Sequence, residues 1–227
     1  MENLISIKKI LNINNEYYLF TGNIIGESNI YNPKEINYQI LNSSKIKLFS
    51  LKDNNRITAC AFYEKEDKKI IIYTGTEKGS IAIYEEKEVN RGKFNYINII
   101  HPHTKQINYL NVNLTLNMLI DCSNDNLINL YIIPSLKIVR SIYNDTSLII
   151  EKVFLSSSPL PSFITYSRDN HLVSYSINGK KLTSVYINNE FNEPSVISGN
   201  FVDYLIYRKG KNFLSFNIKK LPYLTDV

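Results

Sequence analysis

The chain has 227 residues, of which 44% are hydrophobic and 21% charged, a composition typical of a globular protein with a sizeable core and not of a disordered chain. Its formal net charge of +5 is spread over the whole length, so charge alone does not indicate a nucleic-acid-binding surface. No window reaches the ~18 apolar residues of a membrane-spanning helix, and the N-terminal residues do not resemble a signal peptide.

A strand–turn–strand unit recurs five times along the chain. In each copy an apolar strand precedes a turn rich in Gly, Asn or Asp, residues that tolerate positive φ, and an aromatic residue ends the next strand. The aromatic residues lie 53, 47, 44 and 41 residues apart, and a period of this size is typical of repeated β-units. They are Tyr31, Tyr84, Tyr131, Tyr175 and Phe216.

About four short strands are predicted for each unit, because further apolar segments flank every turn and no helical period is sustained over about 12 residues. A four-stranded sheet buries little by itself, whereas sheets stacked face to face share one core. We therefore expect an all-β protein, a β-propeller of about five four-stranded blades in one domain over residues 1–227. The predicted blade cores lie near 17–41, 57–100, 107–142, 149–186 and 195–227.

The unit at residues 74–84, TGTEKGSIAIY, resembles a WD repeat, in which a strand, a turn and a second strand end in Trp-Asp. Tyr stands in the place of the Trp in four units and Phe in the fifth. The WD family often links a His at the beginning of a blade, a Ser or Thr, a turn Asp and the Trp. Here His103, Asp125 and Tyr131 match that pattern, with Asp121 in place of the Ser or Thr.

Two other units match this network only in part or depart from it. Asp169 has the turn position in the fourth unit, and Asp53 stands in the His position of the second. The resemblance thus implies that His103, Asp125 and Asp169 are structural residues of the blades.

The order of motifs between residues 57 and 218 is similar to the C-terminal WD-repeat region of BEACH-domain proteins of the neurobeachin and beige type. Its most specific element is the run YSINGK at residues 175–180. In that family the propeller follows a PH-like and a BEACH domain in a large scaffold of vesicle trafficking, lysosome-related organelles and autophagy. The resemblance implies a non-catalytic scaffold that binds other proteins through the propeller rim, and an upstream BEACH domain in the same full-length protein. A closed five-bladed ring and an incomplete ring both stay open.

The sequence contains no pattern of catalytic, cofactor-binding or metal-binding residues. His101-Pro102-His103 lacks a third ligand at a recognisable spacing, and the glycines of residues 74–79 lack the Lys-Ser/Thr ending of a phosphate loop. Cys60 and Cys122 have neither zinc nor disulfide spacing, which predicts buried thiols in a reducing compartment. We expect a cytoplasmic protein, peripheral to endomembranes, that is not an enzyme and holds no cofactor or metal.

Two other functions remain as alternatives. The first is a peripheral membrane module in which Arg208, Lys209 and Lys211 contact anionic lipid. The second is a WD-repeat adaptor in another complex. Nucleic acid is not an expected partner, because most aromatic residues occupy core-facing strand positions and not an exposed basic surface.

Overall fold

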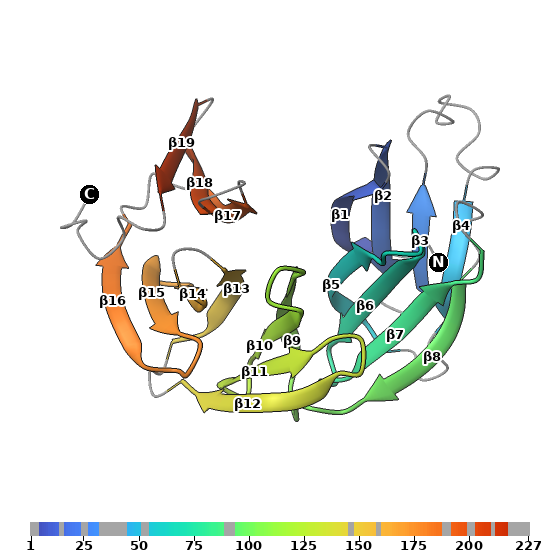
Figure 1. Ribbon diagram of the computed structural model, residues 1–227, viewed down its shortest axis with the longest axis horizontal. Helices are drawn as coiled ribbons and strands as arrows, with labels where there is room; N and C mark the ends of the chain where they lie inside the picture. The colour runs from blue at the N-terminus through green and yellow to red at the C-terminus, as the bar shows by residue number, and fades with distance from the viewer. Residues whose placement is uncertain are drawn as a thin grey trace. The chain divides into compact units, whose positions relative to one another are not determined.

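The described strands form five antiparallel sheets, each made of strands that follow one another in the sequence (Figure 1). The computed structural model describes residues 5–13, 16–23, 27–31, 45–50, 55–88, 94–144, 148–157, 160–187, 192–198, 203–209 and 212–217. These residues contain no helix. The chain divides into two compact units, Met1–Leu110 and Asn111–Val227.

The first unit contains two four-stranded sheets with the orders β1-β2-β3-β4 and β5-β6-β7-β8. The strands of the first sheet are β1 (Ile5–Ile13), β2 (Glu16–Asn23), β3 (Glu27–Tyr31) and β4 (Lys45–Ser50). Those of the second are β5 (Ile57–Glu64), β6 (Ile70–Thr76), β7 (Ile81–Glu86) and β8 (Phe94–Ile100).

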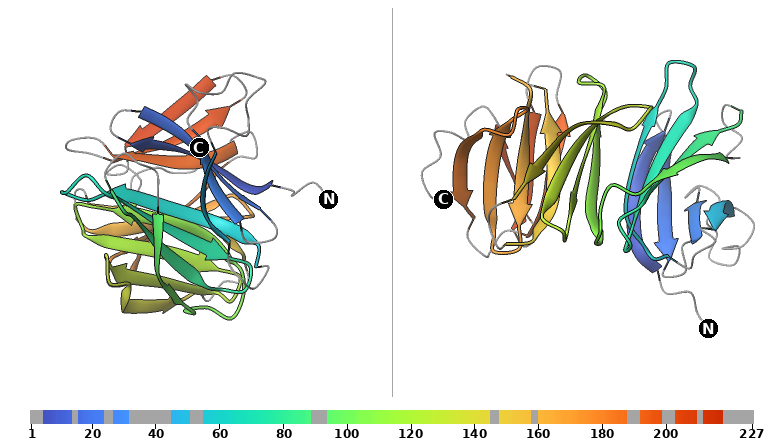
Figure 2. Two further views of the ribbon diagram at one scale, coloured as in Figure 1. Left: turned by 90° about the vertical axis from the view of Figure 1, so that its right-hand side faces the viewer. Right: turned by 90° about the horizontal axis from the view of Figure 1, so that it is seen from below.

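The remaining strands form two further four-stranded sheets and one sheet with three described strands, each a meander of neighbouring antiparallel strands (Figure 2). The third sheet contains β9 (Ile107–Asn113), which crosses the division at Leu110, with β10 (Met118–Ser123), β11 (Leu127–Ile132) and β12 (Lys137–Tyr143). The fourth contains β13 (Ile150–Ser156), β14 (Ser162–Ser167), β15 (His171–Ser176) and β16 (Lys181–Tyr186). The fifth contains β17 (Asn192–Ser198), β18 (Asp203–Lys209) and β19 (Asn212–Asn217).

The predicted all-β class with repeated four-stranded sheets is confirmed. Two strands of the first sheet were not predicted, β1 and β4. Both mix apolar residues with lysines, which hides the apolar pattern of a strand, and each is a strand because it pairs with a neighbouring strand, β1 with β2 and β4 with β3. The predicted strand at residues 38–41 lies outside the described residues.

In the second, third and fourth sheets, whose side chains the structure describes, burial falls from the second to the fourth strand. The second strands β6 and β14 are buried at every position, and β10 at all but its first. The fourth strands β8, β12 and β16 are mostly exposed, and each lies at the edge of its sheet. A strand buried on both faces needs an almost continuous apolar run, which is what Ile70–Thr76 supplies.

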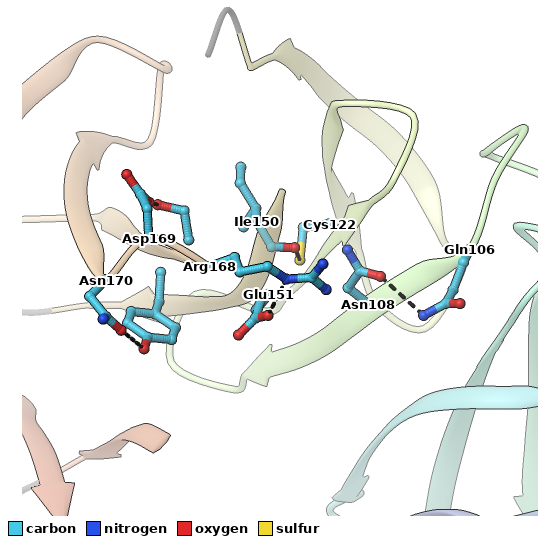
Figure 3. Close-up of polar contacts among 10 residues, drawn as sticks. Gln106, Asn108, Cys122, Ile150, Glu151, Arg168, Asp169 and Asn170 are labelled. Carbon is cyan, nitrogen blue, oxygen red and sulfur yellow. Dashed lines mark hydrogen bonds and ion pairs between the residues drawn. The ribbon is translucent and has the colours of Figure 1, made fainter. Parts of the chain in front are cut away.

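The third and fourth sheets pack against each other through β10 and β13. The Sγ of Cys122 on β10 lies 3.7 Å from the carbonyl oxygen of Ile150 on β13 (Figure 3). Cys60 and Cys122 are both buried free thiols, as predicted. At this interface Cys122 therefore fills space between the two sheets as a small apolar side chain.

The same turn joins the second and third strands of three sheets. Its third residue has a positive φ, which is 83° at Gly79, 67° at Asn126 and 65° at Asn170. The amide of this residue donates to the carbonyl oxygen three residues earlier in each copy. Its own carbonyl oxygen accepts a hydrogen bond from the segment that follows the fourth strand, for example from the His103 amide to Gly79 at 3.3 Å. The turn therefore also fixes how the chain leaves the sheet.

Candidate functional site

The recurring aromatic residues occupy the third strand of their sheets, but their burial differs. Tyr84 and Tyr131 are fully buried, whereas Tyr175 is half-buried and stacks on Phe163 with ring centroids 4.9 Å apart. Tyr31 is the last residue of β3, and Phe216 lies in β19. The side chains of both residues lie outside the described part of the structure. Burial raises the pKa of the Tyr84 hydroxyl to about 12, because the apolar surroundings disfavour the phenolate.

Tyr131 and Asp121 form a buried pair within the third sheet. The Tyr131 hydroxyl donates to Oδ2 of Asp121 at 2.5 Å, and Oδ1 of the same carboxylate accepts the Asn129 amide at 3.0 Å. Burial is the main reason that the pKa of the Tyr131 hydroxyl lies well above its usual range, and the neighbouring Asp121 carboxylate raises this pKa further. Asp121 and Tyr131, two of the four positions that the resemblance links, are thus hydrogen-bonded to each other.

His103 and Asp125, the two other residues predicted for this network, lie at opposite ends of the unit in sequence. His103 is buried, and its backbone is held by the Gly79 turn. In the turn after β10, Oδ1 of Asp125 accepts the Leu127 amide at 3.0 Å, and the Ser123 hydroxyl accepts the Asp125 amide at 3.2 Å. Asp125 therefore closes its own turn, and the four-residue network as a whole stays a prediction.

Asn55 is a structural residue that the sequence analysis missed. It is buried just before β5, its side-chain amide donates to the Thr76 hydroxyl at 3.1 Å, and its Oδ1 accepts the Lys78 amide at 3.2 Å. It therefore links the chain before the first strand to the turn after the second. Asp53, which the sequence analysis placed in the His position of this unit, lies outside the described residues.

A polar cluster lies in the turn after β14. The Ser167 hydroxyl donates to Oδ1 of Asp169 at 2.7 Å, and Nδ1 of His171 donates to Oδ2 at 2.5 Å. Arg168, which lies between Ser167 and Asp169 in the sequence, forms an ion pair with Glu151 at 3.0 Å on the exposed side, and Asn170 follows Asp169 in the turn (Figure 3). Asp169 thus has a hydrogen-bonded partner on each oxygen.

This Ser–Asp–His cluster is not arranged for nucleophilic catalysis. A nucleophilic triad places the histidine between the hydroxyl and the acid, so that the ring can take the hydroxyl proton. Here the carboxylate of Asp169 stands in the centre, and Ser167 donates to the acid itself. The cluster fixes the turn and the orientation of the His171 ring.

Replacing Ser167 by alanine is expected to raise the pKa of the Asp169 carboxyl. Burial by itself would raise this pKa, but the hydrogen bonds from Ser167 and His171 outweigh burial and lower it. A carboxyl with a lowered folded-state pKa stabilises the fold above its ordinary value of about 3.9, and that contribution is lost as the pH falls through the folded pKa. The pKa is measured from the Asp169 carboxyl ¹³C shift against pH.

In the same variant the free energy of unfolding at neutral pH should fall by about 1 kcal/mol. This difference from the wild type should shrink in acid, because protonated Asp169 no longer gains from the Ser167 hydroxyl. A constant difference across the whole pH range would contradict the charge-assisted bond.

A cleft of about 240 Å³ opens over one face of the fourth sheet, beside the cluster. Thr165, Val173 and Ser184 form its floor, because Val173 on β15 pairs with Thr165 on β14 and with Ser184 on β16. Tyr175 pairs with Lys181 at one end. The lining residues are Asn144, Leu148, Ile150, Thr165, Ser167, His171, Val173, Tyr175, Lys181 and Ser184.

The basic residues predicted to contact lipid are not placed by the structure in a way that tests the prediction. Arg208 and Lys209 belong to β18, but their side chains lie outside the described part, as does all of Lys211. Among the described residues there is no group of three potential metal ligands. In the same part of the chain, no helix has the length and apolar character needed to cross a membrane.

Comparison with known proteins shows similarity in fold and not in sequence. No family model and no curated protein matches the chain. The structure is similar to that of BBS1N in complex with ARL6DN, with a TM-score of 0.66, 13% identity, and coverage of 95% of this chain and 66% of that one. It is also similar to the computationally designed protein Ika8, with a TM-score of 0.62, 14% identity and coverage of 94% and 58%.

These similarities show the fold. The chain has a β-propeller fold built of antiparallel sheets, and it spans less than two thirds of the length of BBS1N and of Ika8. In all, 1347 chains of solved structures match, so the fold by itself does not select one function.

Proposed function

We propose that the chain is a non-catalytic protein-interaction module that binds its partners along the edge strands of its sheets. The supporting observation is the distribution of exposed apolar side chains. Seven of the ten exposed large hydrophobic residues in the described part lie on β8, β12 or β16, each the fourth strand of its sheet. They are Tyr96, Ile97, Ile138, Val139, Tyr143, Leu182 and Tyr186.

Strand β12 shows why such an edge suits a partner. Ile138 and Val139 follow each other in sequence and therefore point to opposite faces of the sheet, yet they are 45% and 53% exposed. Tyr143 at the end of the strand is 62% exposed. An edge strand with free pairing capacity and exposed apolar side chains on both faces would normally be covered, and it is the surface on which an extended segment of another protein can pair.

The finer assignment extends this module to the WD-repeat type and to the C-terminal part of a BEACH-type protein of vesicle trafficking, lysosomes or autophagy. It is supported by the motifs of residues 57–218 and by the recurring turns and aromatic positions of the sheets. BBS1N, to which the fold is similar, is itself seen in complex with another protein. The assignment is tested by titrating the purified chain with a purified BEACH domain from the same organism and measuring binding. The absence of binding removes the trafficking role.

The interaction surface is tested by placing a photo-crosslinking amino acid at Val139. We expect a covalent adduct with one partner protein in cells, which mass spectrometry identifies. The matched control is Leu114, which is 55% exposed but lies in the β9–β10 turn and not on an edge strand. Equal adducts from both positions would indicate nonspecific contact.

With the purified partner, Val139→Asp should weaken binding about tenfold, because a charge placed in an apolar contact must be desolvated. Leu114→Asp should leave the affinity unchanged. Isothermal titration calorimetry of the full chain with both variants measures the difference. The same affinity for Val139→Asp and the wild type would exclude β12 as the interface.

A further inference from the structure

The cleft of the fourth sheet has the chemistry of an anion-binding site. Of the residues that line it, Lys181 and His171 are basic, and no lining residue in the described part carries a carboxylate. The nearest acid of the turn, Asp169, already accepts hydrogen bonds on both oxygens, from Ser167 and His171. An anion that enters the cleft therefore meets the basic side chains of Lys181 and His171, and the Asp169 carboxylate beside it is already hydrogen-bonded.

Polar groups between the two basic residues can supply hydrogen bonds. Ser184 lies on β16 opposite Val173, and Tyr175 lies opposite Lys181. Hydroxyl groups donate to carboxylate or phosphate oxygens, and an ammonium group strengthens such contacts by its charge. The bond from Nδ1 of His171 to Asp169 fixes the ring against the cleft, where it also contacts Tyr186 with ring centroids 5.3 Å apart.

The size of the cleft indicates what carries the anion. Its volume of about 240 Å³ is below the roughly 300–1,000 Å³ of sites for drug-sized ligands and cofactors. A single side chain fits such a volume. The cleft is also bordered by β16, an edge strand with exposed Leu182 and Tyr186, on which a partner segment can lie.

We propose that the cleft beside Lys181 binds an anionic side chain of a partner protein, a carboxylate or a phosphate, and so selects acidic or phosphorylated segments. This inference rests on the proposed interaction function and adds the chemistry of the partner. Lys181 is the principal charge that attracts the anion. Ser184 gives the site a hydrogen-bond donor, Tyr175 borders it beside Lys181, and the apolar residues Leu148, Ile150 and Val173 hold the methylene stem.

The test uses the full chain labelled with ¹³C and ¹⁵N at histidine, because only three histidines occur and their ring signals are easily separated. The probes are the N-acetyl N-methylamides of glutamate and of phosphoserine, added to millimolar concentration. We expect the ring signals of His171 to shift with at least one probe, while those of His101 and His103 stay in place. The probe that binds with the higher affinity shows whether the cleft prefers a carboxylate or a phosphate.

Lys181→Gln should weaken binding of the stronger probe about fivefold, as expected for the loss of one partly exposed charge. The matched control is Lys180→Gln, which removes the neighbouring exposed charge in the turn but not a lining residue. Circular dichroism confirms that both variants are folded. The proposal is overturned if His171 does not respond to either probe, if all three histidines respond alike, or if both variants lose affinity equally.

These outcomes separate this proposal from the interaction function on which it rests. A partner that crosslinks at Val139 while neither probe moves His171 leaves the interaction module intact and removes the anion site. Probes that bind the cleft in a protein with no crosslinked partner leave an anion-binding cleft but remove the interaction module, and with it the assignment of the anion to a partner protein.

Discussion

Replacing Tyr131 by alanine is expected to lower the free energy of unfolding by about 3–5 kcal/mol, one of the largest effects of a single substitution in this chain. The ring is fully buried in β11, so its removal opens a cavity in the third sheet. It also removes the hydroxyl that donates to the Asp121 carboxylate at 2.5 Å, which leaves a buried anion with one donor fewer. Denaturant-induced unfolding of the purified variant measures the loss.

Two companion variants separate packing from hydrogen bonding at this position. Tyr131→Phe keeps the ring and loses only the hydroxyl, so we expect a loss of about 1–3 kcal/mol from the hydrogen bond that the Asp121 carboxylate no longer accepts. Tyr175→Ala changes the equivalent residue of the fourth sheet, which is only half-buried, and should cost less than Tyr131→Ala. If Tyr131→Ala were no more destabilising than Tyr175→Ala, burial of the aromatic position would not be what stabilises the third sheet.

The turns and the central strands were predictable because their determinants are local. Gly, Asn and Asp are the residues that accept a positive φ, and the structure places such a φ at Gly79, Asn126 and Asn170, one in each of three turns. The fully buried second strands need continuous apolar sequence, which a run such as Ile70–Thr76 shows directly. A period of about 46 residues between aromatic positions then indicated repeated sheets.

The first sheet was predicted less well because its outer strands lack such signals. Strand β1 contains Lys8-Lys9 and β4 begins with Lys45 and contains Lys47, so neither reads as a buried apolar strand. Each pairs with a neighbour through backbone hydrogen bonds, which any side chain permits. Pairing across the sheet, and not local composition, makes these segments strands.

The candidate site was the least predictable feature because its residues meet only after folding. Asp169 was predicted from its turn, but the cleft combines Asn144 before β13 with Lys181 on β16, about 37 residues later. Asn55 reaches Thr76 across 21 residues in the same way. One signal was present, since Ser123 and Ser167 precede the turn aspartates at the same offset in two units. Their hydroxyls hold both turns, and this role of serine can be read from the repeats once they are aligned.

Replacing Gly79 by alanine is expected to destabilise the first unit by about 3 kcal/mol or more. Its φ of 83° is unfavourable for any residue with a Cβ, which costs about 1–2 kcal/mol. A Cβ at this position would also lie 2.3 Å from the carbonyl oxygen of His103 and 2.8 Å from that of Lys105, so backbone would have to move. The loss is measured by denaturation, and amide exchange of the 101–106 segment reports whether this loop is displaced.

Two variants show which of these causes dominates. Gly179 has the same φ of 83°, but a Cβ there meets only side-chain atoms of Ile142, the nearest at 3.1 Å, so Gly179→Ala should cost only about 1–2 kcal/mol. Gly79→Asn introduces the residue that the equivalent turns carry at Asn126 and Asn170, where a positive φ is tolerated. If Gly79→Asn is as destabilising as Gly79→Ala, the close approach of the His103 backbone is what requires glycine. If asparagine restores the wild-type midpoint, φ strain alone explains the requirement, and the close approach of the His103 backbone does not by itself require glycine.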